Sequence, residues 1–259
     1  MEFKPTTLKE ALKAKGVSMI VYGNPGVGKT SLIKTLVGGV WNEKDMKWAY
    51  TGKKYCEPED ILLITVDAGE SVLDDPALHN MAVIILEEEV ESLATFKGIV
   101  QRLRESCPWK WVFIDNMSEL EKFFLMSLTK IKTLDVPRTK EWGDAAFYMR
   151  KYIRDLRGIT KHGTNVIFIF WAMSVKDTDK DGVVEHTVMP MVMEKTSKEF
   201  VGLVEHTAYM GISEKSGKRY LQFDSNKLVF CKKRNDNLKQ FEEANLGDIF
   251  RLLKGGKGE

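Results

Sequence analysis

Five short runs of apolar, often β-branched residues stand at intervals along the chain and predict five strands. The run at residues 61–66 is continuous and β-branched, so we expect both faces of that strand to be buried, as in a parallel sheet. The runs at residues 111–114 and 165–170 are also interpreted as buried strands. The predicted strands cover residues 18–22, 61–66, 81–86, 111–114 and 165–170. A sheet of this kind needs a layer of helices on each face.

Helical periodicity fills most of the intervals between these strands, with apolar residues three and four positions apart. Predicted helices run over residues 29–37, 90–105, 141–159 and 246–253, and another begins near Ser118. Two glycines at residues 38–39 close the first of them. Strands that alternate with helices predict an α/β fold with a mostly parallel, doubly wound sheet.

The pattern changes after the fifth predicted strand. Residues 174–187 are polar and turn-prone, which predicts a mobile loop. Beyond it the pattern predicts a helix end and antiparallel strands in residues 200–210, 219–223 and 228–231, with a hairpin turn at 214–218. We therefore expect an antiparallel C-terminal extension of the sheet.

The chain shows no internal repeat and no linker, which predicts a single domain over residues 17–254. Residues 1–16 predict a short N-terminal helical arm that opens on a capping box. Residues 255–259 are rich in glycine and predict a disordered tail. The polar stretch at residues 41–60 has no clear period and is interpreted as an insertion.

The composition is that of a soluble globular protein, with 43% hydrophobic and 29% charged residues among 259. A formal net charge of +2 argues against a protein held to nucleic acid by bulk charge, although it permits a local basic groove. Three widely spaced cysteines predict reduced thiols rather than disulfides. The longest apolar run, residues 166–173, is too short to span a membrane, and no signal segment is visible. We therefore expect a cytoplasmic protein without a membrane partner.

The strongest chemical signal is the stretch GNPGVGKT at residues 23–30, a complete GxxxxGK[ST] phosphate-binding motif. It follows a predicted strand and opens a predicted helix, as the motif requires. Its glycines let the backbone wrap around phosphate oxygens, and the helix N-terminus adds partial positive charge. Lys29 is the candidate cation for the β- and γ-phosphates, and Thr30 is a candidate Mg²⁺ ligand. The candidate nucleotide-binding residues are Gly23, Asn24, Pro25, Gly26, Val27, Gly28, Lys29, Thr30 and Ser31.

Two acidic residues are candidates to complete such a site. Asp115 ends the predicted strand at residues 111–114, where it would reach the metal; a helix-capping Asp is the alternative interpretation. Asn116 follows it, so the adjacent second acid common in ATPases is missing. Glu70 lies just past the strand at residues 61–66 and is the candidate to activate water, unless it is a solvated loop acid.

Several segments resemble the RecA-type recombinases. Residues 66–76, VDAGESVLDDP, resemble the segment that carries the catalytic glutamate of that family, with Gly69 inserted. The phosphate motif, the acid-ended strand and the strand at residues 166–169 occur in the same order as in that family. The stretches YGNPGVGKT at residues 22–30 and EWG at 141–143 resemble its compact phage members, which are linked to single-strand annealing and often described as phage AAA nucleotide-binding proteins.

The resemblance covers roughly residues 17–250 and implies a RecA-like P-loop NTPase fold that binds ATP and Mg²⁺. By this resemblance Lys29 would bind phosphate, and Thr30 and Asp115 would hold the metal. Glu70 would activate the attacking water. The resemblance further implies a slow, DNA-stimulated ATP hydrolase that acts on single-stranded DNA in phage-type recombination or annealing. It would assemble as a homo-oligomeric ring or filament, with a single-strand-binding protein as a further partner, in the bacterial host cytoplasm if phage-encoded.

The stretch FCKKR at residues 230–234 resembles the late basic motif with which RecA-like subunits reach a neighbour's nucleotide. Lys233 and Arg234 are therefore candidate catalytic residues that act in trans, with a solvated basic turn as the alternative. Trp171 departs from the family, because it stands where a glutamine senses the γ-phosphate. The loop at residues 174–187 occupies the DNA-loop position, although its acidic residues make it a weak phosphate-binding segment.

Two weaker signals have two interpretations each. The aromatic residues Trp41, Trp48 and Tyr50 either stack on bases or cover the nucleotide. The basic face of the helix at residues 141–159, with Tyr148 and Tyr152 interleaved, either lines single-stranded DNA or is solvated. Two other functional classes also stay open. One is a nucleotide-gated, oligomerising binding module with little turnover, and the other is a small-molecule kinase, which would need arginines in a lid.

Overall fold

The computed structural model describes residues 15–43, 45–66, 68–87, 90–129, 137–178 and 184–255. The predicted arm at residues 1–16 and the predicted tail at 255–259 fall almost wholly outside these ranges, and both stay predictions. Within them, no helix is both long and apolar enough to cross a membrane.

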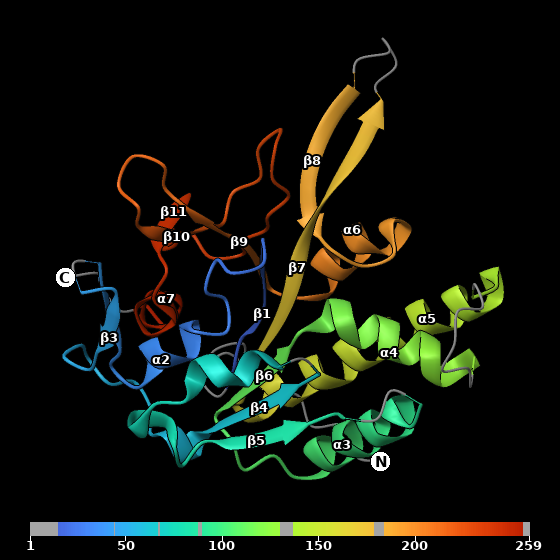
Figure 1. The fold of residues 1–259 in the computed structure, drawn as a ribbon, viewed down its shortest axis with the longest axis horizontal. Coiled ribbons are helices and arrows are strands. Elements are labelled where there is room, and N and C mark those ends of the chain that lie inside the picture. The colour runs from blue at the N-terminus through green and yellow to red at the C-terminus, as the bar shows by residue number, and fades with distance from the viewer. Residues whose placement is uncertain are drawn as a thin grey trace, which may run out of the picture.

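A mixed, mostly parallel sheet forms the centre of the molecule (Figure 1). Its path contains β1 (Ser18–Gly23), β4 (Ile61–Thr65), β5 (Ala82–Ile85), β6 (Trp111–Asp115), β7 (Asn165–Thr178), β9 (His206–Ile212), β10 (Arg219–Gln222) and β11 (Phe241–Glu243). The spatial order is β11-β10-β9-β1-β7-β6-β4-β5. The six strands from β9 to β5 are parallel, and β10 and β11 continue the sheet antiparallel. The predicted α/β sheet with an antiparallel extension is confirmed.

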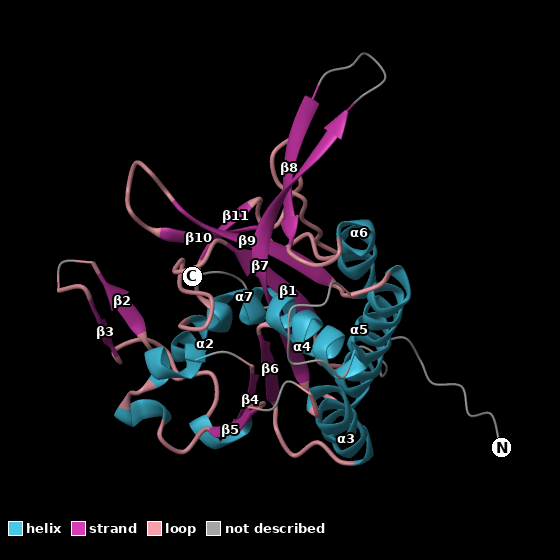
Figure 2. Ribbon diagram, turned by 45° about the vertical axis from the view of Figure 1, so that its right-hand side comes forward, coloured by secondary structure: helices cyan, strands magenta, loops and turns pink. Residues whose placement is uncertain are grey.

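Helices cover both faces of this sheet, as Figure 2 shows. One layer consists of α3 (Ser92–Glu105), α4 (Met117–Thr129), α5 (Thr139–Ile159) and α6 (Glu194–Leu203), and the other of α2 (Leu32–Leu36) and α7 (Leu246–Leu253). Short 3-10 helices span Pro58–Asp60 (η1), Ala68–Leu73 (η2), Pro76–Leu78 (η3) and Thr160–His162 (η4). The doubly wound arrangement predicted from the alternation of elements is therefore present.

Strand β1 explains why the strands are so uniformly apolar. Ile20 and Tyr22 are fully buried in the core under the larger helical layer. Met19 and Val21 alternate with them and are fully buried in the core under α2 and α7. Because side chains point alternately to the two faces, a strand between two cores must be apolar at every position.

The insertion at residues 41–60 is more ordered than its sequence indicates. It contributes to a two-stranded hairpin of β2 (Val40–Asn42) and β3 (Lys47–Ala49). Trp41 lies opposite Trp48, and their rings meet edge to face with centroids 5.6 Å apart. The strands are three residues long, too short to show a period in sequence, and the aromatic pair stabilises their pairing.

The prediction of a mobile loop at residues 174–187 is wrong for the residues that the structure describes there. Strand β7 continues to Thr178 and pairs antiparallel with β8 (Val184–Pro190), from Ala172 opposite Pro190 outward. The pair forms an arm that projects from the body of the molecule (Figures 1 and 2). Polar residues form strands here because each strand supplies the other's backbone hydrogen bonds, which requires no buried face.

Two smaller expectations also change. Residues 228–231 do not form a strand; they contribute single bridges, as in the pairing of Val188 with Val229. Strand β9 runs parallel to β1 and antiparallel to β10, so it links the parallel core to the extension. The hairpin turn predicted at residues 214–218 connects β9 to β10, as expected.

Candidate functional site

The phosphate motif lies where β1 ends, at the carboxyl edge of the parallel strands. Gly26 and Gly28 have positive φ angles of 77° and 99°, which residues with a side chain rarely adopt. Beside Gly26 nothing lies within 4 Å of an added Cβ, so the loop is open on that side. The helix predicted from residue 29 begins only at Leu32, because residues 29–31 form tight turns with hydrogen bonds three residues apart.

Lys29 holds the phosphate motif in a closed loop. Its Nζ donates to the carbonyl oxygens of Gly23 and Asn24, both at 2.9 Å, and its side chain is buried. The cation therefore sits at the centre of a backbone cradle, the position from which it can meet a phosphate.

Thr30 and Asp115 come together although 85 residues separate them. The Thr30 Oγ1 donates to the Asp115 Oδ2 at 2.5 Å, and Asp115 is buried at the end of β6. A hydroxyl and one carboxylate beside a phosphate cradle are the donor set that Mg²⁺ uses when phosphates and water fill its other positions. These residues fit Mg²⁺, and the two metal candidates lie together as the sequence predicts. The Asn116 side chain accepts from the Glu119 N–H at 2.8 Å and thus caps α4.

A cavity of about 320 Å³, which we call the phosphate cavity, opens over this loop. It is lined by the loop together with Trp41, Trp48, Gly69, Val72, Asp115, Trp171 and Arg219. The Lys122 ammonium lies 4.9 Å from the centroid of the Trp171 ring. An aromatic ring in contact with a cation therefore occupies the position where the family resemblance implies a glutamine.

Glu70 lies on η2, between the cavity-lining residues Gly69 and Val72. Its Oε2 is buried and has no hydrogen-bond partner among the described residues. The residue as a whole is half-buried, and its desolvated oxygen suits a group that orients water. The role of Glu70 as the activating base stays a prediction.

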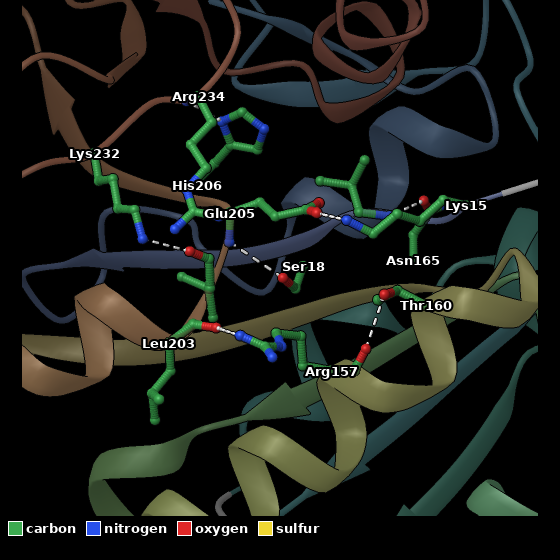
Figure 3. Close-up of polar contacts among 12 residues, drawn as sticks. Lys15, Ser18, Arg157, Thr160, Asn165, Leu203, Glu205, His206, Lys232 and Arg234 are labelled. Carbon is green, nitrogen blue, oxygen red and sulfur yellow. Dashed lines mark hydrogen bonds and ion pairs between the residues drawn. The ribbon is translucent and has the colours of Figure 1, made fainter. Parts of the chain in front are cut away.

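The basic motif at residues 230–234 runs from Phe230, whose carbonyl accepts from the Tyr22 hydroxyl at 2.8 Å, to Arg234 near the start of β1. The Arg234 N–H donates to His206 Nδ1 at 3.4 Å, near the start of β1, whereas the phosphate loop follows the end of β1 (Figure 3). Lys233 makes its hydrogen bonds within its own chain. Its Nζ donates to Asp224 at 2.8 Å and to the Leu238 carbonyl at 3.1 Å. The Arg234 side chain is exposed. Neither residue is brought to the phosphate loop of its own chain.

The Lys232 ammonium caps a helix rather than an anion. It donates to the carbonyl oxygens of Val201, Gly202 and Val204, at the C-terminal end of α6. Figure 3 shows the position of Lys232 beside Leu203 and His206. A cation at this position offsets the partial negative charge of the helix C-terminus. Beside it, burial lowers the pKa of His206 to about 4, so this histidine is neutral near pH 7.

Arg219 is a site residue that sequence reasoning missed. Its Nε donates to the Val27 carbonyl of the phosphate loop at 3.0 Å, and its guanidinium lies 4.9 Å from the centroid of Trp41. It reaches the loop from β10, far along the chain and without a surrounding motif. No local signal points to it, since only the folding of the antiparallel extension beside β1 brings it there.

Of the two interpretations of the tryptophans, the structure favours a cover over the nucleotide, because Trp41 and Trp48 line the phosphate cavity. Whether the basic face of α5 lines single-stranded DNA stays a prediction; Tyr148 on this face is half-buried. Tyr152 is buried, and Arg150 and Lys151 form ion pairs with acidic side chains.

A buried parallel sheet with a phosphate loop, a paired Thr and Asp, and a lysine cradle defines a P-loop nucleotide-binding protein of the α/β class. The chain belongs to the AAA_24 family of AAA domains, whose family model matches residues 15–235. It is accordingly an ATP-binding domain of the P-loop ATPase type. No curated protein shows significant similarity to it.

Proposed function

We propose that this protein is a Mg²⁺-dependent ATP hydrolase that acts on single-stranded DNA in phage-type recombination or annealing. The proposed ATPase activity rests on the 2.5 Å hydrogen bond from Thr30 to Asp115, beside the loop that Lys29 holds closed. Thr30 and Asp115 would hold Mg²⁺, which would supply positive charge against the phosphates. Lys29 and the loop amides hold the phosphates, and Glu70 orients water from the neighbouring segment.

The β7–β8 arm supports a DNA-linked role. β7 contributes Trp171 to the phosphate cavity and then continues without interruption into the arm. A change in the nucleotide's phosphates at Trp171 therefore acts on the base of the β7–β8 arm, which projects into solvent (Figure 1). Such a strand is a direct physical connection between the nucleotide and anything bound to the arm.

The distance of the basic motif from its own phosphate loop supports assembly. Arg234 is exposed, and it lies at the opposite end of β1 from the cradle. An arginine so placed serves a neighbouring subunit's nucleotide in a ring or filament. The proposed location is the bacterial cytoplasm.

The test is the ATP hydrolysis rate with and without a single-stranded oligonucleotide. We expect hydrolysis that needs Mg²⁺ and rises with the oligonucleotide, and loss of hydrolysis in Lys29→Ala. A variant with residues 176–186 replaced by a short turn keeps the basal rate and loses the stimulation. Hydrolysis with neither stimulation nor retention of DNA would remove the recombination role and leave the ATPase.

One observation favours a second candidate, a nucleotide-gated binding module with little turnover. Trp171 has no side-chain amide with which to sense the γ-phosphate, so binding without efficient hydrolysis is the alternative. ATP-dependent assembly at an unchanged, very low turnover, with or without DNA, is the result that would identify it.

A further inference from the structure

A second cavity adjoins the phosphate cavity and has a different chemistry. It measures about 500 Å³, and we call it the hairpin cavity. The two cavities share four wall residues, Gly28, Trp41, Trp48 and Arg219. The two cavities therefore adjoin at these residues.

The hairpin cavity lacks the candidate phosphate-binding lysine and the two candidate metal ligands. Lys29, Thr30 and Asp115 line the phosphate cavity only. The hairpin cavity has apolar side chains, such as Leu32 and Met210, together with the acids Glu43 and Glu243 and the cations Lys218 and Arg219. Carboxylates repel phosphates but accept hydrogen bonds from sugar hydroxyls and exocyclic amines. These walls suit a flat, uncharged heterocycle and its sugar.

The aromatic wall is fixed in place from two sides. Arg219 connects the Trp41 ring to the phosphate loop, with 4.9 Å to the ring centroid and 3.0 Å from its Nε to the Val27 carbonyl. Lys34 lies 5.7 Å from the centroid of Trp48 and 3.6 Å from the carboxylate of Asp75. The hairpin that carries both tryptophans is thus attached to the loop and to α2 by contacts within the chain.

We propose that the hairpin cavity is the nucleoside subsite of the nucleotide, where a purine base packs against the Trp41–Trp48 pair. Arg219 stands at the junction of the two cavities and meets the phosphate chain where it passes between them. This inference rests on the proposed function, because the phosphates occupy the neighbouring cavity. Stacking on bases of DNA is the less suitable use, since the tryptophans line the same cleft as the phosphate loop.

The experiment compares two probes by calorimetry, ATP and inorganic tripolyphosphate, each with Mg²⁺. The native protein binds ATP more tightly than tripolyphosphate, and Lys29→Ala loses both. Ala49 lines the hairpin cavity and not the phosphate cavity. Ala49→Phe, which fills the hairpin cavity, weakens ATP binding roughly ten-fold and leaves tripolyphosphate binding unchanged.

Trp41→Leu weakens ATP binding by a similar factor, and Trp41→Phe restores it because a ring is retained. Trp109→Leu, at the far end of the sheet, is the matched control and keeps native affinity. Thermal melts of each variant separate unfolding from loss of the subsite.

Three outcomes would decide against the inference or its basis. Equal affinity of the native protein for ATP and tripolyphosphate, or unchanged ATP binding in Ala49→Phe, would remove the nucleoside subsite and keep the phosphate site. Loss of oligonucleotide binding with unchanged ATP binding in Trp41→Leu would assign the tryptophans to DNA. Binding of neither probe by folded native protein would overturn the proposed function itself.

Discussion

Single residues at the site differ in how far they can be recognised in the sequence. Thr30 and Lys29 belong to a contiguous motif whose spacing encodes its geometry, and Asp115 is indicated by the apolar strand that ends on it. Arg219 has neither signal, because it is one arginine after a polar turn. Its place beside Val27 depends on the pairing of β9 with β1, a contact between segments far apart in sequence. Residues of this kind are recognised only in the folded chain.

Glu70 provides the residue-scale prediction. Because its buried Oε2 lies beside the phosphate cavity, Glu70→Gln should keep ATP affinity and lower the hydrolysis rate by roughly 10²-fold or more. The measurements are binding of a nucleotide to the variant and its single-turnover rate. Asp74→Asn is the control, since this acid lies on the same segment with its side chain almost fully exposed. Native turnover in Glu70→Gln would assign water activation to another group.

At the scale of elements, prediction succeeds where burial dictates the pattern. Strands β1, β4 and β6 lie between two cores, so all positions except those at their ends are apolar, and their limits are readable to within a residue. The β7–β8 arm and the β2–β3 hairpin lie outside those cores. Their strands are held by pairing with one another, which leaves little hydrophobic signal, and the first was therefore interpreted as a loop.

The contact between α4 and α6 provides the element-scale prediction. Burial raises the pKa of Glu121 on α4 from 4.5 to about 7, while its carboxylate accepts from the Met193 N–H at 3.0 Å, where α6 begins. The folded protein favours the protonated acid, so the stability from this group is full below pH 4.5 and is lost as the pH rises through 7. We therefore compare the free energy of unfolding of Glu121→Gln with that of the native chain. The difference, variant minus native, should be about 2 to 3 kcal/mol more positive at pH 8 than at pH 5.

Urea unfolding of both proteins at pH 5 and pH 8 measures this difference. Comparing the two proteins at each pH matters because His206 has the opposite dependence. Its pKa is lowered to about 4, so its contribution is present above pH 6.5 and is lost as the pH falls through 4. The histidine is common to both proteins and cancels. The same free-energy difference at both pH values would show that Glu121 is ionised in the folded protein throughout this range.

At the scale of the whole molecule, the sheet separates two functional ends. The phosphate loop, the Thr30–Asp115 pair and the two cavities lie at the carboxyl edge of the parallel strands. Arg234 lies at the other edge, beside the start of β1. In a head-to-tail assembly the exposed Arg234 of one subunit can face the phosphate cavity of the next, and such heterologous contacts build rings or filaments.

This geometry predicts complementation between two inactive variants. Lys29→Ala lacks its phosphate cradle but keeps Arg234, and Arg234→Ala keeps the cradle but lacks the arginine. Each alone should show little hydrolysis at a concentration where the native protein is assembled. A mixture should regain activity, because some interfaces then pair an intact cradle with an intact arginine. The measurement is the ATP hydrolysis rate as a function of the mixing ratio.

Lys233→Ala distinguishes a catalytic from a supporting role for the second basic residue. Lys233 already holds Asp224 and the Leu238 carbonyl within its own chain, so its loss should weaken the folded turn as well as turnover. A lower melting temperature together with reduced activity is therefore expected for Lys233→Ala, and an unchanged melting temperature for Arg234→Ala. If the mixture of Lys29→Ala and Arg234→Ala stays inactive while each variant still assembles with native protein, the arginine does not act across subunits. The basic motif would then serve only its own fold, where Lys232 already caps α6.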